Sequence, residues 1–149
     1  MNIALASDHA GYALKERLKV LLDELGHVCV DFGTDSEESC DYPDFAFPAS
    51  EALARGEVDR AVLVCGSGVG MSMCANRVAG VRAALCSSVE IARLSRRHND
   101  ANALCLAARF IDGKTAFEVV RVWLDEAFEG GRHARRVSKM AAYDRSRSR

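Results

Sequence analysis

Short apolar runs alternate along this chain with segments in which apolar residues recur every three or four positions. Such runs are typical of strands buried on both faces, and the periodic segments are typical of helices that cover a sheet. The expected strands are residues 2–6, 28–32, 61–65, 81–86 and 103–107. The expected helices are residues 11–25, 43–54, 71–78, 89–97 and 115–128, followed by a basic amphipathic segment over 132–143.

The alternation of strands and helices, joined by right-handed crossovers, predicts an α/β fold. We expect a three-layer α/β/α, Rossmann-like, doubly wound sheet of about five parallel strands with an extra C-terminal helix. No repeat or linker interrupts the pattern, so residues 1–143 are expected to form a single domain and residues 144–149 a basic, disordered tail. Sheets of this kind bind ligands at the carboxyl ends of their strands, near the point where the strand order reverses.

Composition indicates the cellular compartment and the kind of ligand that the protein binds. The six cysteines form no C-x-x-C pair and have no histidine spacing suited to zinc, so we expect a reducing cytoplasm and no structural zinc. The chain has no apolar stretch that could span a membrane, and strand-like sequence begins at residue 2, which leaves no room for a signal peptide. The basic end of the chain suits an anionic ligand or a solvated tail, and nucleic acid is not expected because Tyr143 is its one aromatic residue.

The most informative segment for chemistry is the apolar run 61–65 with the glycines that follow it, Gly66-Ser67-Gly68-Val69-Gly70. Alternate glycines let the backbone turn sharply and point several N–H groups toward an anion, and the turn opens onto a helix N-terminus. Cys65 ends the strand beside this turn, a setting that stabilises a thiolate. The other buried cysteines are expected to be inert, namely Cys29, Cys74, Cys86 and Cys105.

The spacing of this loop excludes three familiar phosphate-binding motifs. A dinucleotide fingerprint would follow the first strand with the spacing G-x-G-x-x-G, and a P-loop would contain Gly-Lys-Ser/Thr. A cysteine phosphatase would need an arginine at the position that Met71 occupies. The loop is therefore interpreted as a cradle for a smaller anion or an oxyanion.

Other candidates are ambiguous on their own. Asp8 and His9 follow the first strand and suit either a ligand-facing or a structural role. His98 lies in a charged segment and suits either a site or a solvated surface. It precedes the fifth strand, so it would reach the other strand ends by a loop crossing or from a neighbouring subunit. Arg132 and Arg136 share one helix face, where they could grip a phosphate together or form a solvated basic surface.

Several motifs together resemble the type B ribose-5-phosphate isomerases, in a superfamily that also holds allose-6-phosphate and galactose-6-phosphate isomerases. The resemblance extends from residue 2 to about residue 143, with the motifs in the family's order. They are Ser7-Asp8-His9-Ala10-Gly11, Asp41-Tyr42-Pro43, Cys65-Gly66-Ser67-Gly68-Val69-Gly70, Ala75-Asn76-Arg77, Arg96-Arg97-His98-Asn99-Asp100 and Glu129-Gly130-Gly131-Arg132-His133.

This resemblance implies a metal- and cofactor-independent aldose–ketose isomerase of the pentose phosphate pathway, which interconverts ribose 5-phosphate and ribulose 5-phosphate through an enediolate. It also implies a homodimer or homotetramer with the active site at the subunit interface. Cys65 would be the base, His98 would open the sugar ring, and Ser67 would shuttle a proton between the sugar oxygens. The substrate-binding residues would be Asp8, His9, Tyr42, Gly66, Ser67, Gly68, Val69, Gly70, Asn99, Arg109, Arg132 and Arg136.

Three departures from the family pattern bear on the chemistry. Ser67 stands where relatives often have Thr, and Arg77 stands where Lys is frequent, so the hydroxyl and the charge are kept. Met71 stands where one branch of the family has a glutamate base, and a thioether cannot abstract a proton, so an active enzyme must use Cys65. Two alternatives stay open: an isomerase of a six-carbon sugar phosphate (allose 6-phosphate or galactose 6-phosphate), and a non-catalytic sugar-phosphate sensor.

Overall fold

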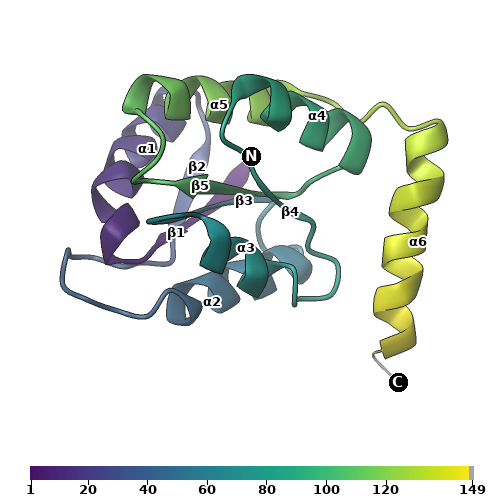
Figure 1. Ribbon diagram of the computed structural model, residues 1–149, viewed down its shortest axis with the longest axis horizontal. Helices are drawn as coiled ribbons and strands as arrows, with labels where there is room; N and C mark the ends of the chain where they lie inside the picture. Colours follow the sequence, from purple (N-terminus) through teal and green to yellow (C-terminus); the bar gives the residue numbers. More distant parts are fainter. Residues whose placement is uncertain (148–149) are drawn as a thin grey trace.

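The computed structural model describes residues 1–147 and contains one five-stranded parallel sheet in the order β2-β1-β3-β5-β4. The strands are β1 Asn2–Ser7, β2 Val28–Asp31, β3 Arg60–Cys65, β4 Ala83–Leu85 and β5 Ala103–Ala107. Helices α1 Tyr12–Glu24, α4 Val89–Asn99 and α5 Gly113–Asp125 cover one face of the sheet, while α2 Pro43–Ala54 and α3 Val69–Ala75 cover the other (Figure 1). The predicted three-layer α/β/α fold with an extra C-terminal helix is confirmed.

Successive side chains of the central strands enter two different cores. The core beneath α1, α4 and α5 receives large side chains from the sheet, namely Ile3, Leu5, Val62, Val64, Leu104 and Leu106. The core beneath α2 and α3 receives mostly small ones, namely Ala4, Ala6, Ala61, Leu63, Cys65, Ala103 and Cys105. Cys65 therefore points toward the layer that contains α3.

The strand order reverses between β1 and β3, because the chain passes from β1 outward to β2 and then returns to the other side of β1. Ser7 is in register with Val64, and Cys65 with Ala107, so the carboxyl ends of β1, β3 and β5 meet at one edge. A short 3₁₀ helix, η1 His9–Gly11, follows β1 closely against β3. A β-carbon on Gly11 would lie 2.6 Å from the carbonyl oxygen of Val64, so this approach requires glycine.

Several boundaries differ from those expected. The strand predicted over 81–86 is shorter, and the helix predicted to reach residue 78 ends at Ala75. Both differences follow from Asn76, whose side-chain amide bonds the backbone N–H and carbonyl of Ala83 and so joins the end of α3 to β4. Helix α4 extends past residue 97 to Asn99, and Asp100 ends it in the left-handed conformation with φ 47°.

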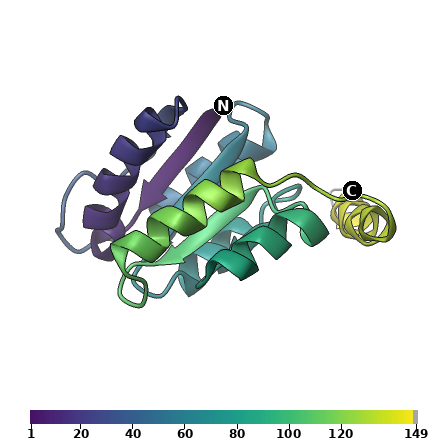
Figure 2. The same ribbon diagram turned by 90° about the horizontal axis from the view of Figure 1, so that it is seen from above.

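Helix α6, Arg132–Arg147, stands apart from the layered body (Figures 1 and 2). It continues through Asp144, where the sequence predicts the start of a disordered tail, and residues 148 and 149 of that tail lie outside the described residues. The Asp144 carboxylate accepts a hydrogen bond from the Gly80 N–H at 2.9 Å, which ties the far end of the helix to the loop before β4. Within residues 1–147, no helix combines the length and apolar character that a bilayer crossing requires.

Candidate active site

Cys65 occupies the end of β3 at the point where the strand order reverses. Its sulfur accepts a hydrogen bond from the Gly68 N–H at 3.1 Å, and only 3% of the residue is exposed. A peptide N–H aimed at the sulfur stabilises a thiolate more than a thiol, because the donor dipole favours the charged form. The Cys65 thiol therefore lies beside the glycine turn, as the sequence predicts.

Gly68 gives the turn its shape. It is the N-cap of α3 with φ 73°, and a β-carbon there would lie 3.1 Å from the carbonyl carbon of Leu106 in the neighbouring strand. Both the positive φ and the close approach to β5 exclude larger residues. The turn thus brings the Gly68 N–H back onto Cys65 because position 68 is glycine.

The other core thiols have different surroundings. Burial raises the pKa of Cys74, Cys86 and Cys105, with that of Cys86 raised to about 11. Burial also raises the pKa of Cys29. This residue was expected to be fully buried, but the structure shows it half-buried. A raised pKa keeps these four side chains as neutral thiols at pH 7, which agrees with the inert role expected for them.

Tyr42 and Arg109 flank the glycine loop from two other elements. A β-carbon on Gly70 would lie 2.7 Å from Cζ of Tyr42, and one on Gly66 would lie 3.2 Å from Nη1 of Arg109. The Arg109 N–H also donates to the Gly66 carbonyl at 3.0 Å. The loop is therefore walled by an aromatic ring at its far end and by a guanidinium group at its start.

The hydroxyl of Ser67 accepts a hydrogen bond from the Val69 N–H at 3.3 Å, and both residues are exposed at the mouth of the loop. This contact holds the side chain at the start of α3, on the same turn as the Cys65 sulfur. Ser67 is thus a solvent-facing hydroxyl next to the buried thiol.

Asp8 and His9 come to the same edge from the end of β1. The Asp8 N–H donates to the Val64 carbonyl at 3.2 Å, and the Asp8 carboxylate accepts the Gly11 N–H at 3.0 Å as the cap of η1. Nδ1 of His9 lies 3.2 Å from both the backbone N and the carbonyl oxygen of Cys40, so the backbone of Cys40 holds the ring in place. The structure therefore brings together Asp8, His9, Tyr42, the loop Cys65 to Gly70, and Arg109.

The remaining candidates lie at the opposite edge of the sheet. His98 and Asn99 end α4 just before β5 begins, and Arg132 and Arg136 lie on α6. The five residues of β5 separate the two edges by about 13 Å at about 3.3 Å per residue. Within one chain, these four residues do not join the cluster around Cys65.

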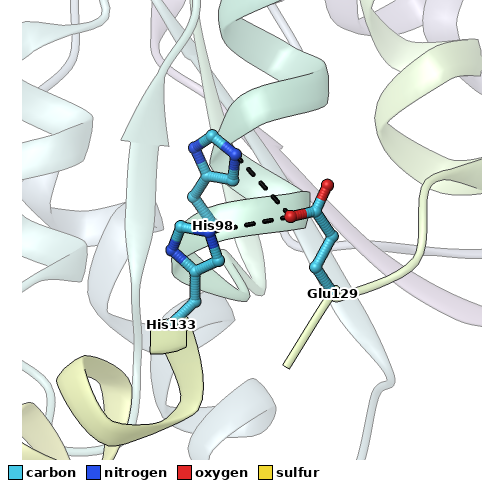
Figure 3. A group of neighbouring side chains, drawn as sticks. All are labelled: His98, Glu129 and His133. Atoms are coloured by element: carbon cyan, nitrogen blue, oxygen red, sulfur yellow. Dashed lines mark ion pairs between the residues drawn. The ribbon is translucent and has the colours of Figure 1, made fainter. Parts of the chain in front are cut away.

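His98 belongs to a compact group with Glu129 and His133, two residues of the Glu129 to His133 motif for which the sequence predicted no role (Figure 3). The two imidazole rings stack with centroids 4.2 Å apart and planes 11° apart. The Oε2 atom of Glu129 lies 3.9 Å from Nε2 of His98 and 3.6 Å from Nε2 of His133. Burial and the nearby His98 lower the pKa of His133.

Within the described part of the chain, these three side chains are also a group that could offer a metal ion its ligands, with ligand atoms within 4.8 Å of one another. Stacked rings keep their nitrogen lone pairs in two separate, nearly parallel planes, so a shared ion would require one ring to turn. The guanidinium of Arg97 already holds the other carboxylate oxygen of Glu129. The arrangement suits charge pairing better than metal ligation.

A groove of about 930 Å³ lies between α6 and the body. Asn99, Arg82 and Ala83 line its inner side, and Lys139 and Tyr143 of α6 line its outer side. Cys65 is absent from its walls. This large concavity is therefore separate from the thiol and its glycine loop.

A parallel α/β sheet with a thiol, a glycine loop and the guanidinium of Arg109 near the strand-order reversal defines an enzyme-like anion site. The sequence model of the Ribose/Galactose Isomerase family matches residues 3–140. The chain belongs to this family, as its resemblance to the type B ribose-5-phosphate isomerases led us to expect. The expectation that it is an isomerase enzyme is confirmed at this level.

Individual relatives match along nearly the whole chain. The ribose-5-phosphate isomerase B of Escherichia coli is 43% identical over 147 residues, covering 99% of each chain. The structure of ribose-5-phosphate isomerase B from Clostridium thermocellum superposes with a TM-score of 0.96 at 45% identity, covering 98% of this chain and 99% of that one. The enzyme from Mycoplasma genitalium with bound ribulose-5-phosphate superposes with a TM-score of 0.93 at 41% identity, covering 97% and 96%.

Proposed function

We propose that this protein interconverts ribose 5-phosphate and ribulose 5-phosphate without a metal ion, with Cys65 as the base. The observation that carries the proposal is the hydrogen bond from the Gly68 N–H to the Cys65 sulfur at the strand-order reversal. Full-length similarity to ribose-5-phosphate isomerases B, one of them with ribulose-5-phosphate bound, supports the choice of a five-carbon substrate.

In the isomerisation step, the Cys65 thiolate removes the proton from C2 of the open-chain aldose and leaves an enediolate. The same sulfur then delivers a proton to C1, while the Ser67 hydroxyl passes the O2 proton to O1, which yields the ketose. Backbone N–H groups of the loop Gly66 to Gly70 stabilise the negative charge on the oxygens, in the role that a Lewis acid would otherwise fill.

Ring opening and phosphate binding involve His98, Arg132 and Arg136, which lie away from Cys65 in one chain. His98 protonates the ring oxygen of the furanose while the hydroxyl on C1 loses its proton to a base in the solvent, and breaking of the C1–ring-oxygen bond then gives the open-chain aldehyde. Arg132 and Arg136 hold the phosphate together with His9, and the binding energy orients C1 and C2 against Cys65. His98, Arg132 and Arg136 lie at the edge of the sheet opposite to Cys65 and His9 within one chain. We therefore infer that each site combines Cys65 of one copy with His98 of another.

Purified protein in a chelator such as EDTA is expected to form ribulose 5-phosphate from ribose 5-phosphate at its full rate. Rates on allose 6-phosphate and galactose 6-phosphate, measured alongside, are expected to be lower. A higher rate on either hexose phosphate would replace the five-carbon substrate by a six-carbon one. Saturable binding of these sugars without turnover would favour the sensor, and loss of activity in the chelator would contradict the metal-free scheme.

Arg136→Ala is expected to raise KM for ribose 5-phosphate by about tenfold to a hundredfold, since a charge-assisted contact to phosphate contributes about 1.5–3 kcal/mol. Arg136 is exposed on α6 and its guanidinium has no part in proton transfer, so kcat should change much less. Steady-state kinetics checks this, with Arg135→Ala, the exposed neighbour on the same helix, as the matched control. A fall in kcat with unchanged KM would argue against phosphate binding by Arg136.

A further inference from the structure

We propose that Glu129 is a positioning residue for His98: its carboxylate, anchored by Arg97, fixes the imidazole that opens the sugar ring. This proposal rests on the role of His98 proposed above, and it assigns a task to a residue outside the candidate site predicted from the sequence. All the residues concerned belong to one chain, so the arrangement is complete before any assembly forms.

The carboxylate of Glu129 is held on one side by the last turn of α4. Nε of Arg97 lies 2.5 Å from Oε1 of Glu129, and Nη2 of the same guanidinium contacts the same oxygen. The backbone N–H of Glu129 also donates to the Arg97 carbonyl at 3.0 Å. Side-chain and main-chain bonds to one arginine thus fix both the position and the direction of the carboxylate.

The second oxygen of this anchored carboxylate faces both imidazoles. Oε2 lies 3.9 Å from Nε2 of His98 and 3.6 Å from Nε2 of His133, as Figure 3 shows with dashed lines. Because Arg97 precedes His98 directly in α4, the anchor and the ring that it steadies share one rigid turn. Small rotations of the His98 ring would therefore be resisted by a fixed negative charge at its edge.

His133 supports the same arrangement from the other face of the ring. It is buried, with 6% exposure, and its plane lies nearly parallel to that of His98 at a centroid distance of 4.2 Å. A buried ring stacked on His98 leaves it little room to tilt, while the anchored carboxylate lies at the Nε2 edge of both rings. The His98 imidazole is thus held from its face and from its edge.

The reaction itself offers a way to separate positioning of His98 from a general structural role. Ribose 5-phosphate is mostly a furanose, so it must be opened before isomerisation. Ribulose 5-phosphate cannot close onto its C2 carbonyl through C5, because the C5 oxygen carries the phosphate. Deprotonation of ribulose 5-phosphate at C1 therefore needs Cys65 and does not need ring opening by His98.

The test uses Glu129→Gln, which keeps the shape of the side chain and removes its charge. With ribose 5-phosphate, kcat is expected to fall roughly tenfold to a hundredfold, less than for loss of the acid itself, with KM within about twofold of wild type. With ribulose 5-phosphate in D₂O, loss of the C1 proton signal by NMR should proceed at close to the wild-type rate. The C1 proton signal is lost both when the proton exchanges with deuterium and when ribulose 5-phosphate is converted to ribose 5-phosphate. Its loss therefore reports on proton abstraction from C1.

Glu126→Gln is the matched control, because Glu126 also lies near Arg97, at 3.9 Å, and pairs with Arg93 at 3.3 Å. It should behave like wild type with both substrates, while Arg97→Gln should reproduce the selective loss of Glu129→Gln in weaker form. Equal losses of Glu129→Gln on both substrates, or no loss on either, would overturn the positioning role. A wild-type protein inactive on ribose 5-phosphate would instead refute the function proposed above.

Discussion

Cys65→Ala is expected to reduce turnover of ribose 5-phosphate by about a thousandfold or more, which corresponds to about 4 kcal/mol of transition-state stabilisation. The thiolate is the group that removes the C2 proton in the proposed mechanism, and the Gly68 N–H stabilises it through a 3.1 Å hydrogen bond. Affinity for the substrate should change little, because the sulfur takes no part in phosphate binding. Steady-state rates and direct binding by calorimetry check the two halves of this expectation.

Two further variants serve as controls for Cys65→Ala. Cys65→Ser keeps an acceptor for the Gly68 N–H but replaces the thiol by a much weaker acid, so it should be nearly as inactive as Cys65→Ala. Cys74→Ala removes a buried thiol from α3 in the same core and should keep near-normal turnover. Near-normal turnover by Cys65→Ala would show that another group is the base.

Those parts of the site that lie near one another in sequence were predictable from the sequence. The apolar run before Cys65 and the alternate glycines after it define both the strand and the turn, and the structure adds the hydrogen bond from Gly68. The positions of Asp8 and His9 also followed, because the ends of parallel strands share an edge of the sheet. Strand ends therefore carry site information even before the pairing order is known.

The group around His98 was harder to predict, because its members meet through tertiary structure. Glu129 contacts His98 after α5 has returned the chain along the sheet, and the stacking of His133 depends on where α6 departs from the body. Helix α6 also continues past residue 143, where arginine and serine predicted a tail. The arginine- and serine-rich composition of residues 144–149 indicated a solvated segment. The tertiary hydrogen bond between Asp144 and Gly80 could not be read from the sequence pattern.

Mixing two inactive variants is expected to restore activity. Cys65→Ala and His98→Asn should each be inactive on ribose 5-phosphate, one for want of the base and the other for want of the ring-opening acid. If each site combines Cys65 of one copy with His98 of another, a mixed dimer holds one site with both changes and one site with neither. Equal amounts unfolded and refolded together should then recover about a quarter of wild-type activity, since half of the dimers are mixed.

The refolding experiment distinguishes a shared site from a site within one chain because Cys65 and His98 lie at opposite edges of the sheet. Cys65 ends β3 and His98 precedes β5, so the length of the sheet lies between them in one chain. Had both groups served one site within a chain, every site in a mixed dimer would carry one change, and no activity would return. Cys65→Ala refolded with Cys65→Ser is the matched control, because no combination of these two variants contains a site with a thiol.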